Sequence, residues 1–241
     1  MQNQRKITGV ASISSMRITA IVPAAGRGRR LGSSVPKQFI KIDGKPILIH
    51  SLQILDDVAD LSEIIISAQA SEINTIRKLV QDFHIKKVMD VVEGGEERIQ
   101  SVRNAFNSIG STDYVLIHDS VRPFITKGLI KDVLMSGISY GAAISAIPVT
   151  DTVKFTDNNG IIVKNINRSG LWLAQTPQVF KYSILAEAYK MYDTRRVDVT
   201  DESGLVELLG VKVRTVAGSI FNIKITREED LVLAQLIAGM P

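Results

Sequence analysis

The sequence predicts an α/β fold, in which a Rossmann-like, mostly parallel sheet is flanked by helices and a β-hairpin arm projects from it. Three observations predict this class. Apolar strand-like runs alternate with helical patterns, a glycine-rich basic loop follows the first run, and an Asn-Gly turn joins two β-branched runs. Strands separated by helices of roughly ten to fifteen residues are typical of βαβ units and a parallel sheet.

The strand-like runs are short and apolar, as expected for buried strands. They are Ile18–Val22, Ile64–Ala68, Val88–Val92, Tyr114–His118, Ala142–Ile147, Val211–Val216 and Ile220–Ile225. Helical spacing between them places helices at 46–58, 71–82, 97–108, 127–138, 181–191 and 202–209. A last helix is expected after a capping box formed by Thr226 and Glu229. We expect 17–241 to form a single domain behind a flexible extension, residues 1–16.

The segment 151–167 departs from the alternation, because its pattern is strand, turn, strand. Thr152–Thr156 and Ile161–Ile166 flank an Asn-Gly turn, which is a strong hairpin signal. The sequence offers no helix to cover both faces of this hairpin. We therefore expect an arm at about 150–170 that packs against a second copy of the chain to form a homodimer. A hairpin folded back on its own domain is the alternative.

Composition excludes several classes of protein. The chain has no cysteine, which excludes disulfides, thiol nucleophiles and thiolate metal sites. No apolar run approaches the roughly eighteen residues that span a bilayer, so we expect no membrane partner and a cytoplasmic protein. Residues 1–16 are polar and contain no acid; if they are the remnant of a transit peptide, the location would be a plastid instead.

The loop from Pro23 to Lys37 concentrates positive charge. Arg27, Arg29, Arg30 and Lys37 share it with no acidic residue, while the whole chain carries a net charge of only +4. This concentration favours a compact polyanion such as a polyphosphate. A nucleic acid would call for a longer basic face with aromatic side chains, and only 5% of the residues are aromatic, so we expect no nucleic-acid partner.

The same loop follows the first predicted strand, where ligands bind in open α/β sheets. Its small residues allow backbone N–H groups to approach a phosphate chain. The Walker string is absent, and a dinucleotide fingerprint would require glycine where Leu31 stands. The loop therefore predicts a triphosphate site.

Further segments make the resemblance specific. From Arg17 onward the chain resembles the 2-C-methyl-D-erythritol 4-phosphate cytidylyltransferase family, which belongs to the nucleotidyltransferases that build activated sugars and polyols. The segments that carry the resemblance are Pro36–Phe39, Gly94–Val102, His118–Pro123, Asp151–Lys154, Arg168–Trp172, Thr176–Gln178, Thr200–Glu202 and Asn222–Lys224. Glu96 and Ser120 stand where the family commonly has Asp and Ala.

The resemblance implies an enzyme of isoprenoid biosynthesis, in which a polyol phosphate attacks the α-phosphorus of CTP in line and pyrophosphate leaves. The acceptor would be 2-C-methyl-D-erythritol 4-phosphate and the product 4-CDP-2-C-methyl-D-erythritol. A phosphate monoester is mostly dianionic at neutral pH, because its second pKa is about 6, so no general base is required. His118 is accordingly interpreted as structural.

The resemblance also assigns roles to individual residues. Asp119 would hold Mg²⁺ or another divalent cation, the alternative being a helix cap. Arg27 and Arg29 are interpreted as solvated loop charges. The catalytic residues would be Arg30, Lys37, Arg168 and Lys224. The nucleotide would contact Pro23, Ala24, Ala25, Gly26, Gly28, Arg30, Lys37, Gly95, Glu96, Ser101 and Ser120, and the acceptor would contact Arg122, Thr152, Arg168, Thr176, Thr200 and Lys224.

Two other functions stay open at this point. A transferase for ribitol 5-phosphate or another sugar phosphate would share the triphosphate loop and differ in its acceptor contacts. A sensor or scaffold without catalytic activity would keep the nucleotide fold alone. The presence of Arg30, Lys37, Asp119 and Lys224 favours an enzyme over the sensor.

Overall fold

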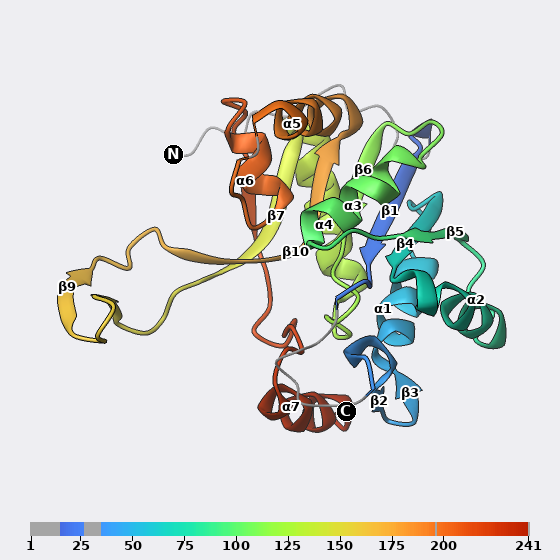
Figure 1. Cartoon of the computed structure of the whole chain (residues 1–241), viewed down its shortest axis with the longest axis horizontal. Coiled ribbons are helices and arrows are strands. Elements are labelled where there is room, and N and C mark those ends of the chain that lie inside the picture. Colours follow the sequence, from blue (N-terminus) through green and yellow to red (C-terminus); the bar gives the residue numbers. More distant parts are fainter. Residues whose placement is uncertain (1–14, 27–34, 196, 241) are drawn as a thin grey trace, which may run out of the picture.

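A seven-stranded sheet forms the centre of the computed structural model, which describes residues 15–26, 35–195 and 197–240. Its strand order is β11-β7-β10-β6-β1-β4-β5, and helices cover both faces (Figure 1). Only β10 runs antiparallel to its neighbours in this sheet. The prediction of a mostly parallel sheet flanked by helices is therefore confirmed. The strands are β1 (Ile18–Pro23), β4 (Glu63–Ala68), β5 (Val88–Glu93), β6 (Tyr114–Ile117), β7 (Ala142–Pro148), β10 (Trp172–Lys181) and β11 (Arg214–Ala217).

Strand β1 lies inside the sheet and contributes side chains to both layers of the core. Ala20 and Val22 belong to one apolar cluster, which also contains Leu52 of α1. Ile21 points to the other cluster, with Val102 of α3. Strands that are buried on both faces require continuous apolar runs, which is why these runs were recognisable in the sequence. The helices are α1 (Ile47–Asp56), α2 (Ile73–Asp82), α3 (Arg98–Asn107), α4 (Lys127–Tyr140), α5 (Tyr182–Arg195), α6 (Glu202–Glu207) and α7 (Glu228–Ala238).

Strand β10 was missed from the sequence, although it lies between β6 and β7. Pro177 interrupts it, and a proline argues against a central strand because it donates no ladder hydrogen bond. The pairing with β7 accommodates the proline through a register shift between Ala174 and Gln178.

The predicted strand Ile220–Ile225 was wrong, and Val211–Val216 was only partly right because β11 begins at Arg214. Residues 220–225 form an irregular segment that is held by side chains. Asn222 is fully buried, and its amide nitrogen donates to the carbonyl of Thr176 at 2.8 Å. Ile220 is 70% exposed, so the start of this apolar run lies outside the core.

The cap of the last helix also differs from the prediction. The carboxylate of Asp230, and not that of Glu229, accepts hydrogen bonds from the backbone N–H groups of Thr226 and Arg227. The hydroxyl of Thr226 donates to the same carboxylate at 2.8 Å. The helix begins at Glu228, with Arg227 as its N-cap, so both the cap and its acidic partner lie one residue later than predicted.

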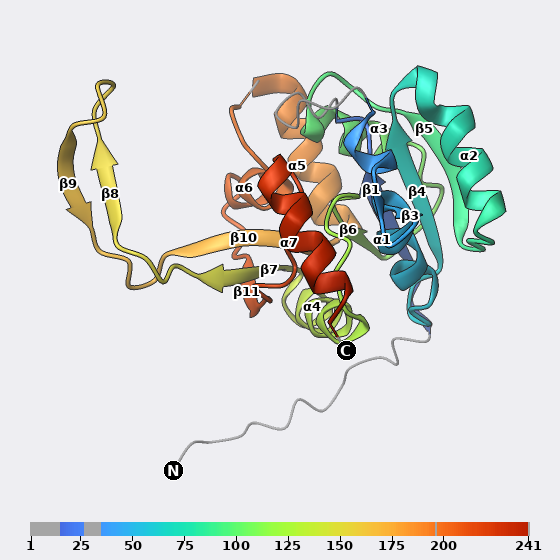
Figure 2. The same ribbon diagram turned by 90° about the horizontal axis from the view of Figure 1, so that it is seen from below.

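The predicted hairpin is formed by β8 (Val153–Thr156) and β9 (Ile162–Ile166), which pair antiparallel. It extends away from the sheet beyond the ends of β7 and β10, as both views show (Figures 1 and 2). It does not fold back on its own domain, so that alternative was wrong. Phe155, Ile162 and Val163 are each more than half exposed on it.

The remaining elements are short. They are the strands β2 (Lys41–Ile42) and β3 (Lys45–Pro46) and the 3-10 turns η3 (Lys37–Phe39) and η4 (Ala70–Glu72). Among the described residues, no helix combines the length and the apolar character that crossing a bilayer demands.

Candidate active site

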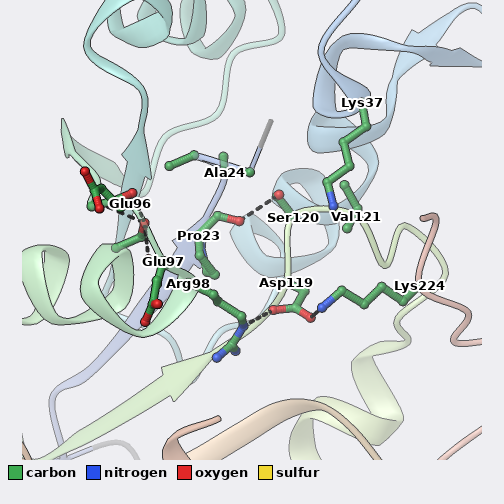
Figure 3. A pocket seen from close by; sticks show the side chains of 14 residues that line it. Pro23, Ala24, Lys37, Glu96, Glu97, Arg98, Asp119, Ser120, Val121 and Lys224 are labelled. Carbon is green, nitrogen blue, oxygen red and sulfur yellow. Dashed lines mark hydrogen bonds and ion pairs between the residues drawn. The ribbon is translucent and has the colours of Figure 1, made fainter. Parts of the chain in front are cut away.

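A cavity of about 190 Å³ opens at the carboxyl ends of β1, β5 and β6. This is the edge of an open α/β sheet at which ligands are expected to bind. Its lining residues come from three separate stretches of the chain and one distant lysine (Figure 3). They are Pro23, Ala24, Ala25, Gly26, Lys37, Gly95, Glu96, Glu97, Arg98, Ser101, Asp119, Ser120, Val121 and Lys224.

The first wall is the start of the basic loop. The N–H of Ala24 donates to the carbonyl of Ser67 at 2.7 Å, and the side-chain amide of Gln69 donates to the carbonyl of Ala25. The side chain of Lys37 lies across Gly26, where an added Cβ would stand 3.5 Å from Lys37 Cε. Because these residues are small, the Lys37 amine and backbone that no large side chain covers lie on the same side of the cavity.

The second wall is the turn between β5 and α3. A Cβ added to Gly94 would stand 2.6 Å from Ala25 Cβ and 2.9 Å from Ser101 Oγ, so only glycine allows the two walls to approach this closely. Ser101 Oγ accepts from the N–H of Gly95 at 3.1 Å. It also donates to the carbonyl of Glu97. Ser101 thus fixes the backbone of this turn from inside the cavity.

The third wall is the segment that follows β6, in which Asp119 stands two residues after the end of the strand. One carboxylate oxygen, Oδ1, accepts from Arg98 Nε at 2.8 Å, and the other, Oδ2, lies 2.7 Å from Lys224 Nζ (Figure 3). Arg122 Nε is farther away, 3.9 Å from Oδ2. Next to it, the hydroxyl of Ser120 donates to the carbonyl of Pro23 at 2.8 Å and joins this wall to the first.

The charge of Asp119 is stabilised by its two cationic partners. Burial alone would raise the pKa of its carboxyl, but Arg98 and Lys224 outweigh burial and hold that pKa well below its usual range. Burial would likewise lower the pKa of Arg98, and the carboxylates of Glu202 and Asp119 raise it instead. Asp119 is therefore an anion and Arg98 a cation at neutral pH.

His118 is completely buried and joins β6 to β10. Its Nε2 lies 3.1 Å from the carbonyl of Arg122, which can only accept, so Nε2 carries the proton. Burial lowers the pKa of His118 to about 4, so the ring is neutral and Nδ1 accepts from the hydroxyl of Thr176. Both ring nitrogens are occupied by protein groups, as the structural interpretation of this histidine predicted.

Thr176 and Arg122, two of the predicted acceptor ligands, lie behind the cavity wall. The Thr176 hydroxyl donates a hydrogen bond to His118 Nδ1 and accepts one from the N–H of Asp119 at 3.0 Å. The guanidinium of Arg122 is largely buried and donates from Nη1 to the carbonyl of Asn222 at 2.7 Å, two residues before Lys224. In this arrangement both residues position Asp119 and Lys224.

Of the remaining predicted acceptor ligands, Lys224 lines the cavity, whereas Thr152, Arg168 and Thr200 do not. Thr152, Arg168 and Thr200 are exposed, and Arg168 donates to the carbonyl of Thr150 at the base of the arm. Gly28 and Arg30 lie outside the described residues. All the other predicted nucleotide ligands line the one cavity, namely Pro23, Ala24, Ala25, Gly26, Lys37, Gly95, Glu96, Ser101 and Ser120.

Two charged residues that support Asp119 were given no role from the sequence, although both lie in segments that carry the resemblance. Arg98 is the first residue of α3, and Glu202 is a fully buried acid that binds it at 2.7 Å. A cation at a helix N-terminus is unfavourable unless anions compensate for it, because the helix dipole is positive there. The position of Arg98 at the start of a predicted helix was therefore the signal in the sequence that it has acidic partners. Nothing local in the sequence connects it with Glu202, which lies 104 residues away.

Comparison with known proteins gives one consistent result. The family model described as 2-C-methyl-D-erythritol 4-phosphate cytidylyltransferase matches residues 18–239. Relatives with that name come from Clostridium perfringens (strain SM101), 38% identical over 91% of this chain and 97% of the relative, and from Syntrophus aciditrophicus, 42% identical over 91% and 94%.

Solved structures agree with the sequence comparison. A 4-diphosphocytidyl-2C-methyl-D-erythritol synthase from Anaerococcus prevotii superposes with a TM-score of 0.84 at 28% identity, covering 95% of this chain and 98% of its own. A 2-C-methyl-D-erythritol 4-phosphate cytidylyltransferase from Thermus thermophilus gives a TM-score of 0.77 at 29% identity, with 91% and 98% covered.

The buried neutral His118 predicts a pH-dependent free energy of unfolding. In the unfolded chain a histidine titrates near pH 6.5, whereas the folded pKa is about 4, so the unfolded state takes up a proton first. The stability is fully present above about pH 6.5 and is lost as the pH falls towards 4, by about 3 kcal/mol for this group. Urea unfolding between pH 7 and pH 4 measures the loss.

The His118→Gln variant should unfold with a weaker dependence on pH over this range, since its side chain cannot take up the proton. His50→Gln serves as the control for the same change of side chain. An unchanged pH dependence in His118→Gln would contradict the assignment.

Proposed function

The chain belongs to the 2-C-methyl-D-erythritol 4-phosphate cytidylyltransferase family, and from this premise we propose how its site works. It joins CTP and 2-C-methyl-D-erythritol 4-phosphate and yields 4-CDP-2-C-methyl-D-erythritol and pyrophosphate, a step of isoprenoid biosynthesis. The observation that carries the proposal is the cavity in which the small-residue loop, Lys37 and the pair of Asp119 and Lys224 meet.

The reaction needs no general base in this site. The acceptor phosphate is mostly dianionic at neutral pH and attacks the α-phosphorus of CTP in line, while the pyrophosphate leaves on the opposite side. His118 could not act as the base, because both of its nitrogens are hydrogen-bonded within the protein. The task of the protein is to hold two anions together and to stabilise the charge that develops between them.

Lys37 and Lys224 supply positive charge from two sides of the cavity (Figure 3). Lys37 comes from the end of the basic loop and is assigned to the triphosphate, together with Arg30. Lys224 comes from the irregular segment that Arg122 and Asn222 hold in place and is assigned to the acceptor phosphate. Fixed cations of this kind stabilise the transition state without having to reorganise during the reaction.

A divalent cation, with Mg²⁺ as the first choice, fits the donor chemistry of Asp119. Carboxylate oxygens are preferred Mg²⁺ ligands, and Mg²⁺ usually binds one or two carboxylates together with phosphates and waters. Within the described ranges no cluster of three or more His, Asp or Glu could hold a metal alone, so phosphate oxygens would have to complete the site. The cation would neutralise charge on the triphosphate, and Lys224 would share Asp119 with it.

The acceptor site is proposed to be shared between two subunits. Arg168 and Thr152 lie on the exposed arm, away from the cavity of their own chain, and Phe155, Ile162 and Val163 give the arm an apolar surface to bury. In a homodimer each arm would bring Arg168 and Thr152 to the partner's cavity. A location in the bacterial cytoplasm completes the proposal, since the relatives are bacterial and both substrates are small water-soluble anions.

The acceptor is tested by measuring pyrophosphate release with CTP and either acceptor. We expect turnover with 2-C-methyl-D-erythritol 4-phosphate to exceed turnover with ribitol 5-phosphate at least tenfold, a discrimination of about 1.4 kcal/mol. Faster turnover with ribitol 5-phosphate would reject the assigned acceptor. CTP binding without release of pyrophosphate from either acceptor would point to a sensor.

Replacing Lys37 tests the triphosphate grip. Lys37→Ala should lower kcat roughly 100-fold or more, the range seen when one transition-state donor is removed. Lys41→Ala, which removes an exposed lysine four residues further on, is the matched control. Steady-state kinetics measures kcat for both variants. Equal kcat values would show that Lys37 does not stabilise the triphosphate in the transition state.

Mixing two inactive variants tests the shared site. If arms cross, a dimer of one Lys37→Ala chain and one Arg168→Ala chain contains one cavity with both residues intact. A one-to-one mixture with random pairing should recover about a quarter of the wild-type sites. Heterodimers shown to form but to remain inactive would indicate that each site is built within one chain.

A further inference from the structure

Glu202 is a buried acid that the proposed chemistry does not use. It is the first residue of α6, it is fully buried, and it is not among the residues that line the cavity. Burying a carboxylate costs several kcal/mol unless a partner compensates for it. Its partner is Arg98, whose Nη1 lies 2.7 Å from Oε2, and the Tyr189 hydroxyl is 3.5 Å from the other oxygen.

Arg98 connects this buried acid to the site. Its guanidinium donates from Nη1 to Glu202 and from Nε to Asp119 Oδ1, so one rigid planar group is held by two carboxylates. An arginine can bind a carboxylate with two parallel hydrogen bonds, for which Nε and Nη2 share one edge. Here only Nε contacts Asp119, and Nη2 is buried without a hydrogen-bond partner in the part of the chain that the structure describes.

This single contact has a consequence for Asp119. Because Arg98 occupies Oδ1 alone, Oδ2 is left for Lys224 Nζ at 2.7 Å. If Glu202 released Arg98, the guanidinium could turn to bind both oxygens of Asp119 and compete with Lys224. In the structure four side chains form a row of alternating charge: Glu202 is negative, Arg98 positive, Asp119 negative and Lys224 positive. Release of Arg98 by Glu202 would break this row at its first ion pair.

We propose that Glu202 is a positioning residue that acts through Arg98 to keep Asp119 directed at Lys224 and the cavity. The inference deepens the proposed function and rests on it, because it assumes that Asp119 and Lys224 take part in the transfer. Glu202 itself touches no substrate.

Glu202→Gln tests the proposal with little change of shape. We expect kcat to fall roughly 10- to 100-fold, as is typical when a supporting partner of a site residue is lost. The KM for CTP should change less than about threefold, because most of the predicted nucleotide contacts lie on the other two walls. Glu207→Gln, an exposed acid on the same helix, is the matched control and should keep wild-type kinetics. Wild-type kcat in Glu202→Gln would overturn the proposal.

A double variant separates positioning from general weakening of the fold. If Glu202 acts through the Asp119–Lys224 pair, adding Glu202→Gln to Lys224→Ala should cost little beyond Lys224→Ala alone. If the kcat losses of the two single variants multiplied in the double variant, Glu202 would act independently of Lys224, and the proposal would be overturned. If the Gln variant does not fold, Glu202→Asp keeps the charge but shortens the reach, and the same kcat loss and coupling are expected of it.

An NMR measurement tests the proposal without relying on the reaction. The Arg98 Nε–H signal should exchange slowly with solvent in the wild type and in Glu207→Gln, and at least tenfold faster in Glu202→Gln. Unchanged exchange in Glu202→Gln would overturn the inference even if kcat fell. A wild-type protein that transfers no cytidylyl group would reject the proposed function, and the Arg98 signal would still decide whether Glu202 holds Arg98.

Discussion

The buried carboxylate of Asp119, held between Arg98 and Lys224, is the interaction on which the rest of the site depends. A lone carboxylate at this depth would be very unfavourable. The contacts bring the N-terminus of α3 and the irregular segment before α7 to the end of β6. One anion thereby determines where two cations of the site lie.

The topology explains why these groups can meet. Parallel strands end at the same edge of a sheet, so the residues that follow β1, β5 and β6 converge although they are far apart in sequence. The antiparallel β10 adds Thr176, whose hydroxyl links the Asp119 backbone to His118. The carboxylate is therefore fixed by its backbone as well as by its charged partners, which is the preorganisation that electrostatic catalysis requires.

Sequence reasoning predicted the parts of this arrangement that are local. The apolar runs of β1, β4 and β6, the Asn-Gly hairpin and the small residues from Pro23 to Gly26 each have a local physical cause. The parts that were missed depend on distant partners. Pro177 concealed β10 because the register shift that accommodates it is invisible in sequence. The role of Glu202 was missed because it depends on contact with the distant Arg98. Lys224 was predicted to lie on a strand, but its segment is held by side-chain hydrogen bonds and not by pairing with a neighbouring strand.

Asp119→Asn, measured for CTP affinity by calorimetry and for turnover in parallel, tests the central claim most directly. The substitution keeps the shape and removes the negative charge that organises Lys224 and Arg98. Measured without a divalent cation, CTP affinity should be kept or should rise, because a negative charge is removed from a cavity that binds an anion. Turnover should fall roughly 100-fold or more, because the cations lose their fixed positions. A variant with near-wild-type turnover would contradict the account.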